Sequence, residues 1–183
     1  MYVFDLDGCV WDPEMYQLWG GGAPFAPDAK NEGELLDCKG QGVSLMADVR
    51  RIWRMLHEDP AYADARVAVA SCCDEPAWAD ECLAKFTVAP GVALADIVSF
   101  SEIHKGSKAG HLASIARASG VALEDMIFFD NEPGNCRTVQ GVGVTSVYTP
   151  GGVTMAEFEK GLAEFPSASV VSMRSARQIR GMR

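Results

Sequence analysis

The heptapeptide YVFDLDG, residues 2–8, places an apolar run directly before two acidic side chains. Alternation along a strand points Asp5 and Asp7 to the same side, and Gly8 allows the chain to turn sharply after them. Two buried carboxylates so close together are costly unless an opposite charge lies nearby. A hard divalent cation held by oxygen ligands would supply that charge. The segment therefore predicts a buried strand with a cation-binding tip, the alternative being that Asp-Gly simply begins a loop.

Four further apolar runs alternate with helical patterns, which is typical of an α/β domain with a mainly parallel sheet. The runs are short, apolar throughout and bounded by polar or Gly residues, as expected for strands covered on both faces. Together with the first run they predict strands at 2–6, 65–70, 97–100, 126–129 and 145–148. The patterns between them predict helices at 45–57, 75–86, 108–119, 133–140 and 154–164. We therefore expect a Rossmann-like three-layer sandwich.

Residues 11–43 interrupt this alternation, because they are rich in Gly and Pro and lack a helical period. The segment predicts a small flap or β-hairpin insertion and no large cap domain. Since it follows the first strand, it should lie over that strand's carboxyl end, where ligands bind in open α/β sheets. We expect one domain over residues 1–166 and a basic C-terminal tail at 167–183. Such a tail fits either a docking face or a solvated terminus.

A second acidic strand end lies in the segment MIFFDNE at residues 126–132. Asp130 follows apolar residues as Asp5 does, and Asn131 adds a neutral oxygen beside it. If the two strands are neighbours, Asp5, Asp7 and Asp130 converge on one cation. The alternative is that Asp130 caps the helix that follows.

Ser71 and Lys108 occupy comparable positions at the ends of predicted elements. Ser71 follows the apolar run at 65–70, and Lys108 opens the helix expected at 108–119. A hydroxyl and an ammonium group can hold phosphoryl oxygens. Either residue alone is a weak signal, so the weight comes from its position, and Lys105 is a rival for the role of Lys108.

In this order the motifs resemble those of the haloacid dehalogenase (HAD) superfamily: D-x-D after strand one, Ser or Thr after strand two, Lys before a helix, and an acidic pair after strand four. Within it, the chain is similar to the small magnesium-dependent phosphatase family over about residues 2–155. The shared stretches are FDLDG at 4–8 with Trp11, GQG at 40–42, EI at 102–103, GSK at 106–108, FFD at 128–130 with Glu132 and Asn135, and GVGVT at 141–145.

The resemblance implies a magnesium-dependent acid phosphatase that hydrolyses phosphomonoesters through an aspartyl-phosphate. Asp5 would attack phosphorus, while Asp7 would act as general acid and base and bind Mg²⁺ through its backbone carbonyl. Ser71 and Lys108 would hold the phosphoryl oxygens, and Asp130 would complete the metal ligands. The resemblance also implies the sheet order 3-2-1-4-5, with strands one and four side by side.

Three polar residues, Asn131, Glu132 and Asn135, are expected around the metal ligands. Asn131 stands where the family usually has a second Asp. This departure should weaken the outer contacts to the metal.

Three cysteines stand beside these motifs. Cys9 occupies a position where the family usually has Thr, and Cys72 one where it usually has Arg, which removes a positive charge near the substrate entrance. With Cys73 they raise the hypothesis of an oxidation-sensitive site. The commoner role of Cys is that of a small buried hydrophobe.

The chain has 183 residues and a formal net charge of −9. This charge argues against a nucleic-acid partner, because phosphate backbones need a basic surface. No apolar run reaches the roughly 18 residues that would cross a bilayer, and the first strand leaves no room for a leader, so we expect a soluble cytoplasmic protein. The expected partner is a small phosphorylated substrate or a phosphoprotein side chain, with phosphotyrosine and phosphosugars both possible.

Two other functions share parts of this pattern. A receiver-like signalling module also uses an α/β sheet, Mg²⁺, a phosphorylated Asp, a Ser or Thr and a Lys. A catalytically weakened phosphate-binding protein is compatible with Asn131. Against the receiver, the second carboxylate at Asp7 favours turnover over storage of the phosphate.

Overall fold

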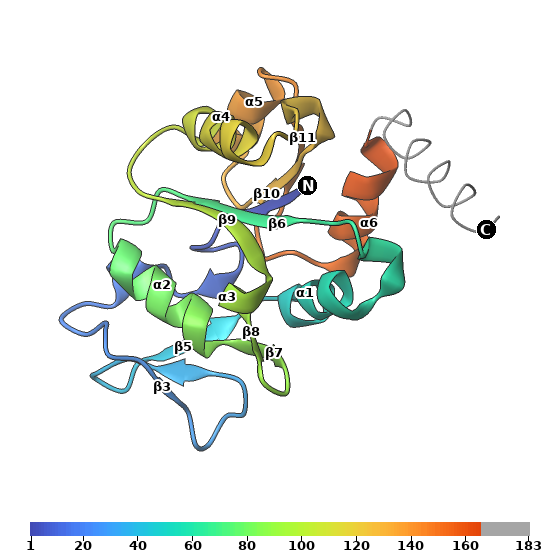
Figure 1. Ribbon diagram of the computed structural model, residues 1–183. Coiled ribbons are helices and arrows are strands. Elements are labelled where there is room, and N and C mark those ends of the chain that lie inside the picture. The colour runs from blue at the N-terminus through green and yellow to red at the C-terminus, as the bar shows by residue number, and fades with distance from the viewer. Residues whose placement is uncertain (166–183) are drawn as a thin grey trace.

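Five parallel strands form the central sheet, shown in the computed structural model of Figure 1, which describes residues 1–165. β1 (Tyr2–Phe4) lies in the middle, between β6 (Val67–Ser71) and β10 (Ile127–Asp130). β9 (Val98–Ile103) and β11 (Thr145–Tyr148) form the two edges. The order β9-β6-β1-β10-β11 confirms the predicted 3-2-1-4-5 arrangement and the α/β fold class.

Helices cover both faces of the sheet and so complete three layers (Figure 1). Val3 and Phe128 point to the face covered by α4 and α5, whereas their neighbours Phe4 and Phe129 point to the face covered by α1, α2 and α6. This alternation gives two apolar cores, one on each side of the sheet. The helices are α1 (Val49–Glu58), α2 (Pro76–Lys85), α4 (Lys108–Ser119), α5 (Pro133–Gln140) and α6 (Met155–Glu164).

Several predicted boundaries differ from the structure. The strand expected at 65–70 lies at 67–71 and the one expected at 97–100 lies at 98–103, and two further differences have a clear cause. The helix expected at 45–57 begins only at Val49, because Leu45 is the last residue of β5 (Gly42–Leu45) and residues 46–48 connect the strand to the helix. The strand expected at 2–6 ends at Phe4, because the chain turns back at Leu6, whose carbonyl oxygen accepts hydrogen bonds from the backbone N–H groups of residues 9–11.

Residues 11–45, which we call the flap, form an antiparallel sheet of four short strands. The flap is larger than a single hairpin, and three of its strands have only two residues, too few to give a periodic signal. Its buried side chains belong to the same core as those of α1 and α2. In spatial order the strands are β2 (Trp11–Asp12), β5, β4 (Leu35–Leu36) and β3 (Ala26–Pro27).

A buried carboxylate holds the loops of the flap together. Asp37 accepts hydrogen bonds from the backbone N–H of Gly22 at 2.9 Å and from those of Lys39 and Gln41 at 2.8 Å each. Burial opposes the charge on this group, but the N–H donors outweigh it and lower the pKa of Asp37. Asp37 therefore acts as a fixed anchor within the flap.

Several short elements were not predicted. β7 (Thr87–Ala89) and β8 (Val92–Ala93) form a small hairpin that leads into the one-turn helix α3 (Leu94–Ile97). The 3₁₀ helices are η1 (Met15–Gln17), η2 (Pro60–Tyr62) and η3 (Leu123–Asp125).

Within residues 1–165, no helix combines the length and apolar character needed to cross a membrane. The basic tail predicted at 167–183 lies outside the described residues.

Candidate active site

The carboxyl ends of β1, β6 and β10 bring the predicted site residues together. Phe4 lies level with Val69 on one side and with Phe129 on the other, so the next residue, Asp5, lies level with Asp130. Asp5 continues the ladder by donating its backbone N–H to the carbonyl oxygen of Phe129 at 2.9 Å. The parallel register thus places the two acidic strand ends side by side.

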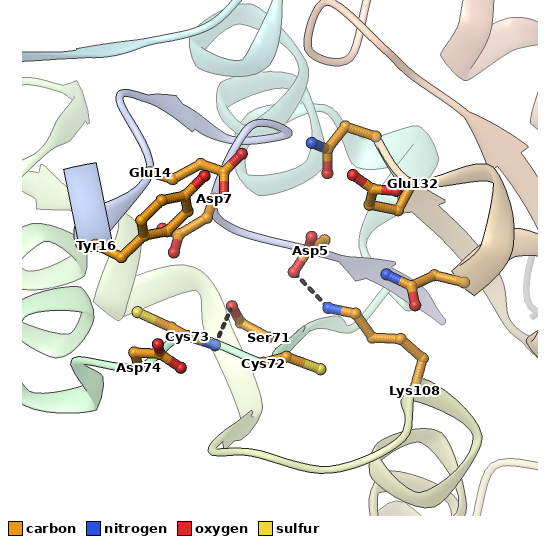
Figure 2. Close-up of a pocket in the computed structure, with 12 residues that line it drawn as sticks. Asp5, Asp7, Glu14, Tyr16, Ser71, Cys72, Cys73, Asp74, Lys108 and Glu132 are labelled. Atoms are coloured by element: carbon orange, nitrogen blue, oxygen red, sulfur yellow. Dashed lines mark hydrogen bonds and ion pairs between the residues drawn. The ribbon is translucent and has the colours of Figure 1, made fainter.

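A cavity of about 240 Å³ opens over these strand ends (Figure 2). Seven of the predicted residues line it, and Asp130 lies beneath them, fully buried. Those lining it are Asp5, Asp7, Ser71, Lys108, Asn131, Glu132 and Asn135.

Lys108 supplies the positive charge at the floor of the cavity. Its Nζ lies 2.5 Å from Oδ1 of Asp5, 2.6 Å from the carbonyl oxygen of Ala70 and 3.6 Å from Oδ2 of Asp130. Burial alone would lower the pKa of Lys108, but the two carboxylates outweigh it and raise the pKa above its usual value. The rival Lys105 instead pairs with Asp74 at the surface, 2.9 Å away.

Asp130 is fixed by hydrogen bonds from the start of α5. Its carboxylate accepts from the backbone N–H of Glu132 at 2.7 Å and from Nδ2 of Asn135 at 3.0 and 3.2 Å. Burial, followed by repulsion from Asp5, raises the pKa of Asp130 above its ordinary value. A carboxylate held in this way, beside a second one, favours a nearby cation.

Asp7 lies in a different environment, although it is only two residues from Asp5. The indole Nε1 of Trp11 donates to its Oδ1 at 2.7 Å, and the Cys73 thiol and the Met15 backbone N–H also donate to it. Burial raises the pKa of Asp7, and the hydrogen bonds of Trp11 and Cys73 only partly oppose this.

The carboxylate of Asp7 is engaged by a residue of the flap. Asp5, Asp7 and Asp130 were expected to converge on one cation, but nowhere in residues 1–165 do three His, Cys, Asp or Glu side chains gather so that they could hold an ion. The Asp7 carboxylate accepts the hydrogen bond from Trp11. The side chains of Asp5 and Asp130 remain the candidate cation ligands.

The remaining oxygen donors fit a hard divalent cation. Two carboxyl groups, those of Asp5 and Asp130, share the single ammonium group of Lys108. Oδ1 of Asn131 is buried and has no hydrogen-bond partner, so it also needs a donor or a cation. Carboxylate, amide and carbonyl oxygens are the ligands that Mg²⁺ prefers.

Ser71 ends β6 beside this cluster and is 1% exposed. Its hydroxyl oxygen accepts a hydrogen bond from the backbone N–H of Cys73 at 3.3 Å. The hydroxyl hydrogen can therefore be donated to an anion in the cavity.

The sequence did not reveal three cavity residues, Glu14, Tyr16 and Asp74. Glu14 and Tyr16 come from the flap and lie beside Asp7 in Figure 2. Their segment carries no periodic pattern, and its position after the first strand was the one available signal.

Two of the three cysteines do not suit oxidation. Burial raises the pKa of the Cys9 thiol well above its usual range and that of Cys73 to about 12, so neither favours a reactive thiolate. Cys72 is exposed at the cavity, where its thiol donates to the carbonyl oxygen of Gly106 at 3.2 Å. The oxidation hypothesis therefore rests on Cys72 alone.

Known proteins resemble this chain along most of its length. Residues 1–168 match the acid phosphatase family. Magnesium-dependent phosphatase 1 of Homo sapiens is 29% identical over 175 residues, which cover 95% of this chain and 91% of the relative. A HAD-like hydrolase superfamily protein of Schizosaccharomyces pombe is 32% identical over 149 residues, which cover 78% of this chain and 81% of the relative.

Solved structures share the fold. CbbY from Rhodobacter sphaeroides, in complex with phosphate, superposes with a TM-score of 0.53 and 14% identity over 84% of this chain and 87% of its own. The N-terminal part of BF1531 from Bacteroides fragilis, which contains a phosphatase domain complexed with Mg, gives a TM-score of 0.52 at 17% identity over 79% of this chain and 34% of its own. The match over residues 1–168 and the 32% identical relative both agree with the order of the motifs. The chain belongs to the acid phosphatase family of HAD-like hydrolases.

Proposed function

We propose that this protein hydrolyses phosphomonoesters in a Mg²⁺-dependent reaction that proceeds through an aspartyl-phosphate on Asp5. The observation that carries the proposal is the buried group of Asp5, Lys108 and Asp130 beneath an open cavity, with Asp7 beside it. The similarity to a human protein named magnesium-dependent phosphatase 1 supports the choice of metal and reaction.

Mg²⁺ would be held by the carboxylates of Asp5 and Asp130 and by the backbone carbonyl of Asp7. When bound, it neutralises charge, so that an anionic nucleophile can approach an anionic phosphate. The unpartnered Oδ1 of Asn131 would lie among the polar groups around these ligands.

The protein's own side chains would carry the chemistry in two steps. In the first, a carboxylate oxygen of Asp5 forms a bond to phosphorus while the bond to the leaving oxygen breaks, and Asp7 donates a proton to that oxygen. In the second, Asp7 accepts a proton from water as the water oxygen attacks phosphorus, which releases inorganic phosphate and frees Asp5. Ser71 and Lys108 donate hydrogen bonds to the phosphoryl oxygens in both steps.

The substrate would be a small phosphoester or an exposed phosphorylated side chain. The cavity is open to solvent and is bordered by Tyr16, a residue that is 53% exposed and whose ring could contact an aromatic or sugar leaving group. Acidic side chains of Glu14, Asp74 and Glu132 also line it, which disfavours a polyanionic substrate such as nucleic acid.

The test is hydrolysis of p-nitrophenyl phosphate with and without Mg²⁺, combined with acid-quench trapping of phosphoprotein. We expect steady turnover with Mg²⁺. Asp5→Asn should abolish both turnover and trapping, and Asp7→Asn should lower kcat by at least about 10²-fold. Asp12→Asn, which changes an exposed acid of β2, is the matched control.

Two outcomes would contradict the proposal. A stable phosphoprotein without turnover in the wild-type chain would identify a receiver-like module. Binding of inorganic phosphate with neither turnover nor phosphorylation would identify a phosphate-binding protein.

A further inference from the structure

The indole of Trp11 connects the flap to the carboxylate of Asp7. Its Nε1 lies 2.7 Å from Oδ1 of Asp7, and the two residues also form a backbone bridge. The backbone N–H of Gly8 donates to the Trp11 carbonyl oxygen at 2.9 Å, and the Trp11 N–H donates to that of Leu6 at 3.2 Å. Trp11 therefore closes the turn that carries Asp7 and also donates a hydrogen bond to the Asp7 side chain.

Packing fixes the Trp11 ring in this position. Trp11 is fully buried and its ring stacks on Phe86, with centroids 6.2 Å apart and an angle of 22° between the planes. Its backbone pairs with Leu45 in β5. The indole therefore has little freedom to rotate away from Asp7.

The chemistry of the indole restricts how Asp7 can hold a proton. The indole N–H is a donor and cannot accept a hydrogen bond. A carboxylic acid accepts a hydrogen bond far better at its carbonyl oxygen than at its hydroxyl oxygen, so Oδ1 is favoured as the acceptor whether Asp7 is protonated or not. The transferable proton is then placed on Oδ2.

We infer that Trp11 is the positioning residue for the general acid, because it determines which oxygen of Asp7 carries the proton given to the leaving group. This inference rests on the proposed function and assigns to the flap a part in catalysis. The Cys73 thiol and the Met15 N–H also help to orient the Asp7 carboxylate, but the thiol is a weaker donor than the indole N–H.

The test uses two substrates that differ in their need for a proton. p-Nitrophenolate leaves readily without protonation, whereas the alkoxide of glycerol 2-phosphate does not. In Trp11→Phe, which keeps an aromatic ring but loses the N–H, kcat/KM with Mg²⁺ should fall about 10–100-fold for glycerol 2-phosphate and less than about threefold for p-nitrophenyl phosphate. Because kcat/KM reports the steps up to formation of the aspartyl-phosphate, slow hydrolysis of that intermediate cannot hide the difference.

Two controls separate positioning from packing. Phe86→Leu disturbs the ring stack but keeps the indole N–H, so it should lower thermal stability without a selective loss for glycerol 2-phosphate. Adding Trp11→Phe to Asp7→Asn should change kcat/KM for glycerol 2-phosphate by less than about twofold, because the group that Trp11 positions is already gone. Trp11→Leu, which also lacks a hydrogen-bond donor, serves if Trp11→Phe does not fold.

Equal losses for both substrates, or none for either, would overturn the role of Trp11 while leaving the proposed function intact. A wild-type protein that hydrolyses neither substrate would instead overturn the proposed function, and this inference with it.

Discussion

Asp5 and Asp7 are two residues apart in the chain, yet their carboxylates have opposite kinds of neighbour. Asp5 faces the ammonium group of Lys108 at 2.5 Å, whereas Asp7 faces the neutral donors of Trp11 and Cys73. The ammonium group gives the Asp5 carboxylate a charged hydrogen-bond partner. Burial among neutral donors raises the pKa of Asp7 and favours the protonated form. The difference supports a nucleophile at Asp5 and an acid at Asp7.

The two environments also come from different parts of the fold. The partners of Asp5 lie on the sheet and at the start of α4, so parallel strand pairing brings them together. Two partners of Asp7, Trp11 and Met15, lie in the flap. We call the surroundings of Asp5 the sheet side and those of Asp7 the flap side. We expect changes on the two sides to affect different steps of the reaction.

Replacing Lys108 should disrupt the surroundings of Asp5 more than any other single change. In Lys108→Met, Asp5 and Asp130 lose the cation between them, so kcat should fall about 10³-fold through the lost contact to the phosphoryl group. Without Mg²⁺, the free energy of unfolding should fall by about 3 kcal/mol, because two carboxylates remain buried and unpaired. Urea unfolding with and without Mg²⁺ measures this loss, which added Mg²⁺ should partly restore.

The matched control is Lys105→Met, which removes a surface lysine paired with Asp74. It should change both kcat and stability little. Equal effects of the two substitutions would show that the buried position of Lys108 is unimportant.

Loosening the flap should affect the Asp7 side alone. Asp37→Ala leaves three backbone N–H groups without their acceptor, so the free energy of unfolding should fall by about 2 kcal/mol. Hydrolysis of glycerol 2-phosphate should decline more than that of p-nitrophenyl phosphate. Asp28→Ala removes a similar but exposed acceptor, for the Lys30 N–H, and should change neither. A uniform loss of activity in Asp37→Ala would contradict a separate role for the flap.

The sheet side could be predicted from sequence, and the flap side largely could not. Asp5, Ser71 and Asp130 each follow an apolar strand, and parallel pairing brings such ends together wherever the strands are neighbours. The sequence left open whether Lys105 or Lys108 enters the site, because that depends on where α4 begins. Ser107 sets this start, since its hydroxyl caps the helix by accepting from the Gly110 N–H at 3.1 Å.

On the flap side, the sequence pointed to Trp11 only as part of a stretch shared with the family. Its polar contact with Asp7 depends on the turn between them, which the hydrophobic pattern does not encode. The three two-residue strands of the flap are also too short for alternation to be visible. Contacts made by a single N–H or a two-residue strand are tertiary properties, so they become visible only in the folded chain.

A smaller test of the sheet side concerns Asn131, which stands where the family resemblance leads us to expect a second Asp. Asn131→Asp should lower the Mg²⁺ concentration for half-maximal activity about tenfold, because a carboxylate near the metal strengthens its outer contacts. Asn135→Ala should raise that concentration, since Asn135 holds Asp130 through both carboxylate oxygens. Titration of activity with Mg²⁺ measures both, and shifts in the same direction would refute this picture of the metal site.

The smallest expected effect concerns the thiol on the Asp7 side. Cys73→Ala removes a weak S–H donor, so kcat/KM for glycerol 2-phosphate should fall only about two- to fivefold, less than in Trp11→Phe. Cys82 is also buried but lies within α2, so Cys82→Ala should leave the ratio of kcat/KM for the two substrates unchanged. The thiol and the indole differ in donor strength but reach the same carboxylate. The ranking of the kcat/KM losses in Cys73→Ala and Trp11→Phe therefore tests whether hydrogen bonding orients the Asp7 carboxylate. A loss in Cys73→Ala as large as that in Trp11→Phe would mean that the shape of the pocket around Asp7 matters more than the strength of its donors.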